Sequence, residues 1–244
     1  MTELFQTILY QPIFNGFVAL YNFIPDVGVA ILILTILVKV ILYPLTDKSI
    51  KAQRSLSSLQ PKMKELKEKY KDNQQVLAQE TMKLYKEHKV NPLGSCLPLL
   101  IQLPIFIALY LVMRDGLAGQ NFNLLYSFVK NPGTINSISV GLVNLAQPNI
   151  ILAVLAGIAQ FFQAKSMIRK HPPQQAGTGG KDEDMMAMMN KQMLYVMPVL
   201  TVIIGIKLPG GLSLYWFIST VLTALQQYWV ARKDKDQSDE GVIL

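Results

Sequence analysis

Charged residues are scarce in this 244-residue chain and make up only 16% of it. Soluble domains carry about 25% charged residues, so the deficit indicates a membrane protein. Cysteine is almost absent: Cys96 stands alone, which excludes an intramolecular disulfide and a cysteine-cluster metal site. The two histidines, His88 and His171, lie in polar segments, so we expect no histidine-based metal site and no cofactor.

Acidic residues are missing from every long apolar run, and Asp26 and Asp115 fall only at the edges of such runs. Proton-driven pumps and many ion-coupled transporters rely on intramembrane acids, so this absence argues against those classes. GTGGK at 177–181 has the wrong spacing for a phosphate-binding loop and lacks the Ser or Thr that should follow. No serine-nucleophile, zinc-helix or paired-acid pattern occurs, so we expect the chain not to be an enzyme.

Basic residues are absent from residues 1–26. A secretory signal needs a positive start and a transit peptide needs arginines, so neither fits. The segment mixes aromatic and aliphatic residues with Gln, Asn and Gly. We therefore expect an amphipathic helix lying in the interface on the outer face, with a weak extra span as the alternative.

Long apolar runs are plentiful, and a membrane span needs roughly 20 such residues. The longest run is divided by LPGG at 208–211, where Pro and paired Gly predict a tight turn. The sequence thus predicts an all-α polytopic membrane protein with five transmembrane helices, at residues 27–46, 94–113, 147–164, 189–207 and 208–231.

Lys and Arg are distributed unevenly between the segments that connect these spans. Nineteen of them lie in alternate segments on one side and three in the segments on the other. Cytoplasmic loops carry the excess of positive charge. We therefore expect the N-terminus and the 114–146 loop outside, and the 47–93 segment, the 165–188 loop and the 232–244 tail in the cytoplasm.

The 47–93 segment is expected to form a cytoplasmic helical hairpin. Its first arm has apolar residues at spacings of three and four, namely Leu56, Leu59, Met63, Leu66 and Tyr70, and Asn73 is placed to cap the second arm. The basic residues of that arm are candidates for docking: Lys48, Lys51, Arg54, Lys62, Lys64 and Lys67. Their charge has two interpretations, a solvated face beside anionic lipid headgroups, or docking of a nascent chain, ribosomal RNA or a targeting receptor.

Lys39 is the exception inside an otherwise aliphatic run, VGVAILILTILVKVILYPLT at 27–46. Its ammonium either snorkels to the cytoplasmic headgroups or faces a wet cavity, because an intramembrane charge costs at least about 2.5–3.5 kcal/mol. Thr35, one turn away, favours a polar stripe over an isolated snorkelling lysine. Polar side chains recur in other spans, at Gln102, Gln163, Tyr215 and Trp216 among others, and together they predict a partly hydrated groove between facing helices.

Four stretches of the chain resemble the YidC/Oxa family of membrane-protein insertases, and the similarity extends over essentially the whole sequence. They are VKVILYPLT (38–46), LQPK (59–62), KVNPLGSCLPLLIQLPIFIALY (89–110) and LPGGLSLYW (208–216). The resemblance implies five helices around a hydrophilic groove that is open to the cytoplasm and to lipid. It also implies an outer amphipathic helix and a two-helix cytoplasmic loop.

Residue roles follow from the same resemblance. The groove charge falls on Lys39, with Gln163 and Trp216 as further polar groove positions, while Thr35, Leu103, Phe106 and Tyr215 match positions along the path of the substrate's hydrophobic segment. The function implied is insertion of nascent membrane proteins into the bacterial cytoplasmic (inner) membrane without nucleotide hydrolysis.

Two departures from the family pattern affect these expectations. Most bacterial members have Arg where this chain has Lys39, so a point charge is retained but the forked donor geometry is lost. The tail carries three bases against four acids, which does not suit ribosome docking. The alternative functions are a small-anion transporter or channel that uses Lys39, and an assembly factor that partners a larger Sec-type translocon.

Overall fold

A computed structural model describes residues 3–71, 73–91, 97–168 and 192–240 of the chain. The elements in chain order are α1 (Glu3–Phe5), the π-helical turn η1 (Gln6–Tyr10), α2 (Gln11–Phe23), α3 (Val27–Ile41), α4 (Tyr43–Ser58), α5 (Gln60–Lys69), α6 (Gln74–Glu87), α7 (Leu97–Leu117), the 3₁₀ turn η3 (Phe122–Leu124), β1 (Ile138–Ser139), β2 (Val143–Asn144), α8 (Ile150–Ile168), the π-helical turn η4 (Gln192–Val196), α10 (Met197–Gly205) and α11 (Gly210–Glu240). Most of the expected 165–188 loop, and the first residues of the expected 94–113 and 189–207 spans, lie outside the described residues.

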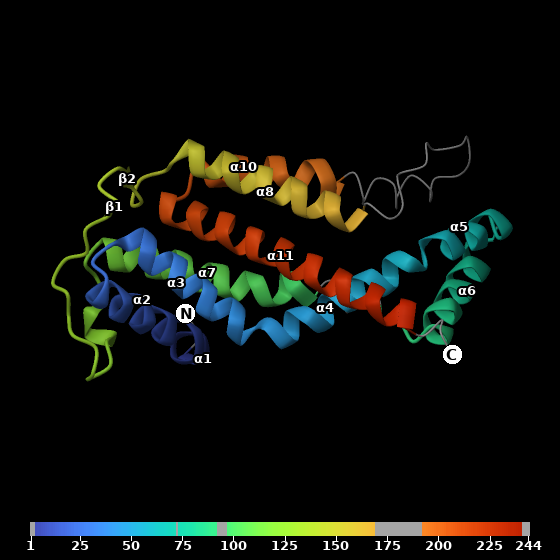
Figure 1. Ribbon diagram of the computed structural model, residues 1–244, viewed down its shortest axis with the longest axis horizontal. Coiled ribbons are helices and arrows are strands. Elements are labelled where there is room, and N and C mark those ends of the chain that lie inside the picture. The colour runs from blue at the N-terminus through green and yellow to red at the C-terminus, as the bar shows by residue number, and fades with distance from the viewer. Residues whose placement is uncertain (1–2, 72, 92–96, 169–191, 241–244) are drawn as a thin grey trace.

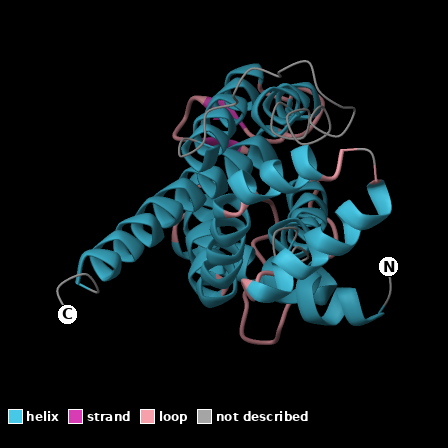
Figure 2. Cartoon of the chain, turned by 90° about the vertical axis from the view of Figure 1, so that its right-hand side faces the viewer, coloured by secondary structure: helices cyan, strands magenta, loops and turns pink. Residues whose placement is uncertain are grey.

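The longer helices run side by side along the long axis of the molecule (Figure 1). α11 packs between α8 and α3, and α8 also packs against α10. The helical pair α5–α6 lies at one end of this bundle, and the short antiparallel pair β1–β2 lies at the other. Figure 2 shows the C-terminal part of α11 projecting away from the other helices.

The helix predicted over 27–46 is shorter than expected. α3 ends at Ile41, the chain turns by 67° at Leu42, and α4 then continues to Ser58. Pro44 explains the break. Its nitrogen has no N–H to donate to the carbonyl one turn earlier, and its ring clashes with that carbonyl. A second break at Leu59, again two residues before a proline, separates α4 from α5, where a single helical arm was expected.

The N-terminal helix α2 has its apolar face buried in the protein. Phe14, Phe17 and Val18 have no solvent exposure and belong to the main core with residues of α3 and α7. Asn15, which is also buried and lies beside this apolar face, holds the loop that follows α7: it accepts a hydrogen bond from the N–H of Tyr126 (2.6 Å) and donates to the carbonyl of Leu124 (3.1 Å). The sequence predicts an amphipathic helix in the interface, and in the structure the apolar face of this helix packs against α3 and α7.

The LPGG segment forms the expected turn between α10 and α11 and is held against the chain that leads into α8. The N–H of Gly210 donates to the carbonyl of Gln147 (2.8 Å), and that of Gly211 donates to Leu145 (2.9 Å). A Cβ on Gly210 would lie 3.0 Å from the Gln147 oxygen, so this close approach favours glycine. The turn is therefore fixed to the β1–β2 end of the bundle.

Among the described residues, one helix is long and apolar enough to cross a membrane by itself, over Leu100–Leu117. The bent pair α3–α4 passes the same test only when it is taken as one span, and the apolar helices Ile150–Ser166 and Gln192–Gly205 are shorter. The protein is mostly helical, and the arrangement of five spans remains a prediction.

Candidate functional site

Lys39 is held by the neighbouring helix α11. Its ammonium donates a hydrogen bond to Oγ1 of Thr223 at 2.8 Å, and that hydroxyl donates in turn to the carbonyl of Ser219, also at 2.8 Å. Lys39 lies twelve residues into α3 and Thr223 thirteen residues into α11, so each is about 18–20 Å along its helix from the β1–β2 end. The two residues therefore sit at similar depth, and the ammonium points sideways into the helix contact.

Thr35 precedes Lys39 by one turn but is almost completely buried, with 2% exposure. Its hydroxyl donates to the carbonyl of Ile31 within α3 at 2.6 Å, a bond that satisfies the donor without any partner from another helix. Thr35 therefore shares a helix face with Lys39 but lies in the packed part of that face.

Gln102 and Tyr215 are brought together from α7 and α11. The amide nitrogen of Gln102 donates to the phenolic oxygen of Tyr215 at 2.5 Å, and the Tyr215 side chain is buried. One turn further along α7, the ring of Phe106 meets Trp216 edge to face, with centroids 5.1 Å apart. These two contacts join α7 to α11 through four of the residues that the sequence selected.

Leu103 is more than half exposed, whereas Phe106 and Trp216 are half-buried. An exposed leucine beside partly covered aromatic rings gives an apolar surface on the α7–α11 side of the bundle. Such a surface suits contact with lipid or with an apolar segment of another chain.

Gln163 is half-buried on α8, and no hydrogen bond among the described residues links its amide to Lys39, Gln102 or Tyr215. Its neighbour Gln160 instead accepts a short hydrogen bond from the hydroxyl of Thr201 on α10. The structure thus brings Lys39, Gln102, Phe106, Tyr215 and Trp216 to the contacts that α3 and α7 make with α11, and Gln163 lies on α8, which also packs against α11.

Thr223 and Thr201 are the two partners that sequence reasoning missed. A threonine in an apolar helix often donates to its own backbone one turn earlier, as Thr35 does, so residue type alone gives no signal. Helix register places Thr223 two turns after Trp216 on the same helix, but it does not show which neighbouring helix Thr223 faces.

The basic residues expected to dock partners lie on different surfaces. Lys48 and Lys51 are exposed on α4, and Lys51 pairs with Asp47 at 2.9 Å. Arg54 and Lys67 are half-buried and already have interaction partners, and the side chain of Lys64 lies outside the described part of the chain. Lys62 on α5 is 2.7 Å from Nε2 of His88.

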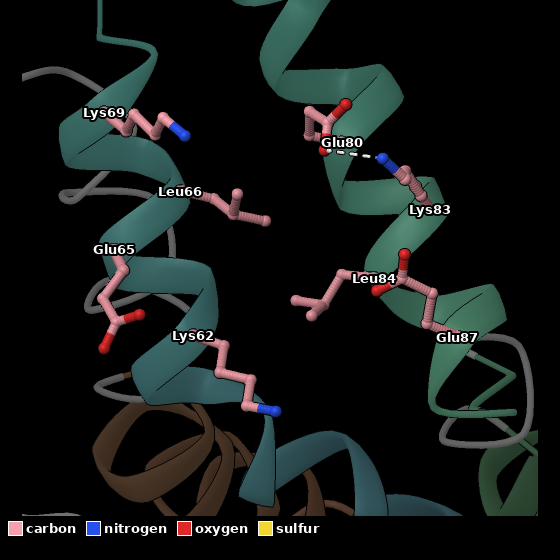
Figure 3. A pocket seen from close by; sticks show the side chains of 8 residues that line it. All are labelled: Lys62, Glu65, Leu66, Lys69, Glu80, Lys83, Leu84 and Glu87. Atoms are coloured by element: carbon pink, nitrogen blue, oxygen red, sulfur yellow. Dashed lines mark ion pairs between the residues drawn. The ribbon is translucent and has the colours of Figure 1, made fainter.

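A cleft of about 300 Å³ separates α5 from α6. Leu66 and Leu84 point toward each other across it, as Figure 3 shows, and the remaining lining residues are Lys62, Glu65, Lys69, Glu80, Lys83 and Glu87. Asn73 caps α6 as the sequence predicts, accepting from the N–H of Val76 at 3.2 Å. Equal numbers of acidic and basic groups line the cleft, so it has no net charge that would select an anionic partner.

Most of the chain matches known proteins. Residues 19–237 match the model of the family described as 60Kd inner membrane protein. The chain is 37% identical over 212 residues to the membrane protein insertase YidC of Fusobacterium nucleatum subsp. nucleatum, an alignment that covers 87% of this chain and 89% of that relative.

Other relatives and a solved structure are longer than this chain. The membrane protein insertase YidC of Pelobacter propionicus is 33% identical over 232 residues, which is 94% of this chain but 40% of that protein. A solved structure described as an active YidC insertase with its first transmembrane domain resolved has a TM-score of 0.60 and 24% identity, and the match covers 93% of this chain and 47% of that one.

The family model and the relatives' names confirm the resemblance found in the sequence and place the chain among bacterial inner-membrane proteins. The chain belongs to the 60Kd inner membrane protein family, which includes the YidC insertases.

Proposed function

We propose that the protein is a membrane-protein insertase that works without nucleotide hydrolysis. Its clients are nascent membrane proteins with short polar tails, which cross the membrane beside Lys39 while the apolar segment leaves into lipid. The observation that carries this proposal is the Lys39 ammonium, held at 2.8 Å by Thr223 between two helices of a membrane-protein fold.

The ammonium of Lys39 is suited to attract an acidic tail. An ammonium carries three donors, and Thr223 uses one of them. No carboxylate forms an ion pair with Lys39 among the described residues, so the charge is available to a substrate. Two unit charges 4 Å apart attract by about 4 kcal/mol at the effective dielectric typical near a protein surface, which offsets part of the tail's desolvation.

The apolar segment of a client is proposed to move along Leu103, Phe106 and Trp216, with Thr35, Gln102, Tyr215 and Gln163 as the polar wall of the groove. Burial of that segment in lipid supplies the net driving force, because apolar surface leaves water. The proposed topology has the α5–α6 end in the cytoplasm, where exposed Lys48 and Lys51 face an anionic surface, either headgroups or a ribosome. A Sec translocon is a possible additional partner in the same membrane.

The test is reconstitution of the purified protein into liposomes with a short single-span substrate. We expect insertion by the wild type, a loss of about tenfold in Lys39→Ala, and nearly full activity in Lys39→Arg, because a point charge is what the site retains. A substrate with a neutral tail is the matched control and should be much less sensitive to Lys39→Ala.

Three results would contradict the proposal: no insertion by the wild type, full insertion by Lys39→Ala, or loss of insertion in Lys39→Arg. The competing function, a small-anion transporter, predicts saturable anion flux across the same liposomes, and that flux is measured in parallel.

A further inference from the structure

The loop between α7 and α8, residues 118–149, has almost no charge and yet presents large apolar side chains. Lys130 is its one charged residue. Phe128, Val140 and Leu142 are 82%, 73% and 85% exposed. A loop surrounded by water would normally carry several charges, since about a quarter of residues in soluble domains are charged. Its composition instead suits the interfacial region of a bilayer, where uncharged polar, aromatic and aliphatic groups are all accommodated.

The exposed residues Val140 and Leu142 belong to the three-residue connection between β1 and β2, which contains a tight turn. Val140 and Gly141 form it with φ angles of +51° and +71°, and the N–H of Leu142 closes it onto the carbonyl of Ser139 at 3.0 Å. Such turns favour Asn-Gly or Asp-Gly, and a β-branched residue in this left-handed conformation is strained. The chain therefore keeps a costly apolar residue at a tip where a polar one would fold more easily.

The turn is held rigidly to the start of α3. The two carboxylate oxygens of Asp26 accept the N–H of Val140 (2.6 Å) and the hydroxyl of Ser139 (2.7 Å), and one of them also caps α3 by accepting the N–H of Val29 (3.0 Å). A Cβ on Gly28 would lie 2.1 Å from the Ser139 hydroxyl, so the contact is also close sterically. The position of the turn is thus coupled to the position of α3.

The apolar tip lies at the same end of the bundle as the start of α8. Five residues after β2, α8 begins with Ile150 and Ile151, both exposed, and the two elements are neighbours at one end of the bundle (Figure 1). In a membrane protein the exposed aliphatic face of such a helix is in contact with lipid. The bilayer that contacts the start of α8 is therefore the occupant best placed to cover the exposed turn at the same end of the bundle.

We propose that the β1–β2 turn is a membrane anchor that inserts Val140 and Leu142 at the boundary between headgroups and acyl chains. It binds lipid, and through Asp26 it sets the depth of α3 in the bilayer. The functional importance of the depth of α3 rests on the proposed function, because α3 carries Lys39. Contact of the turn with lipid does not depend on insertion activity.

The experiment labels single cysteines with an environment-sensitive fluorophore in the full-length protein, in a Cys96→Ser background. Leu142→Cys is the test position, and Thr134→Cys, an exposed polar site in the same loop, is the matched control. The protein is placed in nanodiscs that hold one copy each. We expect spin-labelled lipid to quench the label at 142 at least about twofold more strongly than the label at 134, and aqueous iodide to show the reverse order.

A second variant tests the strained residue. Val140→Asn should relieve the turn, because Asn tolerates the left-handed conformation, and so raise the unfolding temperature in detergent. The same change should reduce lipid quenching at position 142, since an apolar contact is lost. A higher unfolding temperature together with weaker lipid quenching distinguishes a membrane anchor from a turn that only stabilises the fold.

The proposal is overturned if the labels at 142 and 134 are equally accessible to iodide. It is also overturned if the label at 142 is shielded only in liposomes that carry many copies, because another protein molecule would then cover the turn. Failure of the insertion assay alone leaves the quenching result unchanged, so the two proposals fail separately.

Discussion

At the scale of single residues, the hydrogen-bond partner of Lys39 argues against the snorkelling interpretation, while the wet cavity stays a prediction. A snorkelling lysine would extend toward the end of its helix, whereas Lys39 donates across to Thr223 on α11. The Thr223 hydroxyl has its own donor satisfied by Ser219, so its oxygen is fixed as an acceptor for the ammonium. Thr223 therefore acts as a positioning residue for the charge.

Replacing Thr223 with valine is expected to reduce insertion of a substrate with an acidic tail by about tenfold, because hydrogen bonds to charged groups contribute about 1.5–3 kcal/mol. Without its acceptor, the ammonium is free to reorient toward the headgroups. The measurement is the liposome insertion assay with acidic and neutral tails in parallel.

Thr223→Ser keeps the hydroxyl and is the matched control, which should recover most of the activity. Equal insertion by Thr223→Val and the wild type would show that the hydrogen bond has no role in positioning Lys39.

Asp26 is the corresponding residue at the opposite end of α3. Burial disfavours its charged form, but hydrogen bonds from Val140, Val29 and Ser139 outweigh that effect and hold the pKa of the Asp26 carboxyl below its usual value. A lowered pKa means that the carboxylate stabilises the fold above the usual carboxyl pKa of about 3.9, and that this contribution is lost as the pH falls through the lower, folded-state pKa.

Asp26→Asn is therefore expected to lower the stability at pH 7 by about 1–3 kcal/mol, because the N–H groups of Val140 and Val29 and the Ser139 hydroxyl lose a charged acceptor. Thermal unfolding in detergent from pH 7 to pH 3 checks this. The difference between the variant and the wild type should shrink at the acidic end. A difference that stays constant across the range would mean that the carboxylate charge is not what stabilises the turn.

At the scale of elements, small residues allow α8 and α10 to approach closely. A Cβ on Gly157 of α8 would lie 2.4 Å from Cγ2 of Val202 and 3.0 Å from the backbone oxygen of Pro198, both on α10. On the other helix, a Cβ on Gly205 would lie 2.9 Å from that of Ala153. In lipid, where apolar association gains little from the hydrophobic effect, such backbone proximity supplies van der Waals contact between helices.

Gly157→Ala is expected to destabilise the protein by about 1–3 kcal/mol through overpacking, since the Pro198 oxygen cannot rotate away. Unfolding in detergent measures the loss. Val154→Leu adds a carbon on an exposed side of the same helix and should leave the stability nearly unchanged. If both variants unfold like the wild type, the two helices have room to separate and the contact is not tight.

At the scale of the whole molecule, periodicity and composition predicted the mostly helical fold, and the quoted motifs predicted the family. The LPGG turn and the Asn73 cap were predictable because each depends on local backbone chemistry. The bend at Leu42 was open to prediction from Pro44 but was missed, because the apolar run continues across it. The pairing of Lys39 with Thr223 was not predictable, since it depends on how α3 and α11 pack.

The burial of α2 likewise combines a feature that the sequence predicts with one that depends on packing. Its amphipathic pattern is plain in the sequence, but a pattern cannot say whether lipid or protein covers the apolar face. The packing of Phe14, Phe17 and Val18 against α3 and α7 decides this, and α7 lies far from α2 in the sequence. The roles of Lys39, Gln163 and Trp216 in substrate binding stay predictions.

The bend at Leu42 also has a consequence for the surrounding membrane. α3 has 15 residues and so spans about 22 Å. The hydrocarbon core of a typical bilayer is about 30 Å thick. A spanning helix as short as α3 creates a hydrophobic mismatch, which lipids relieve by thinning locally at a cost of fractions of a kcal/mol per Å. The protein would thus compress the bilayer beside Lys39 and shorten the distance that a polar tail must cross.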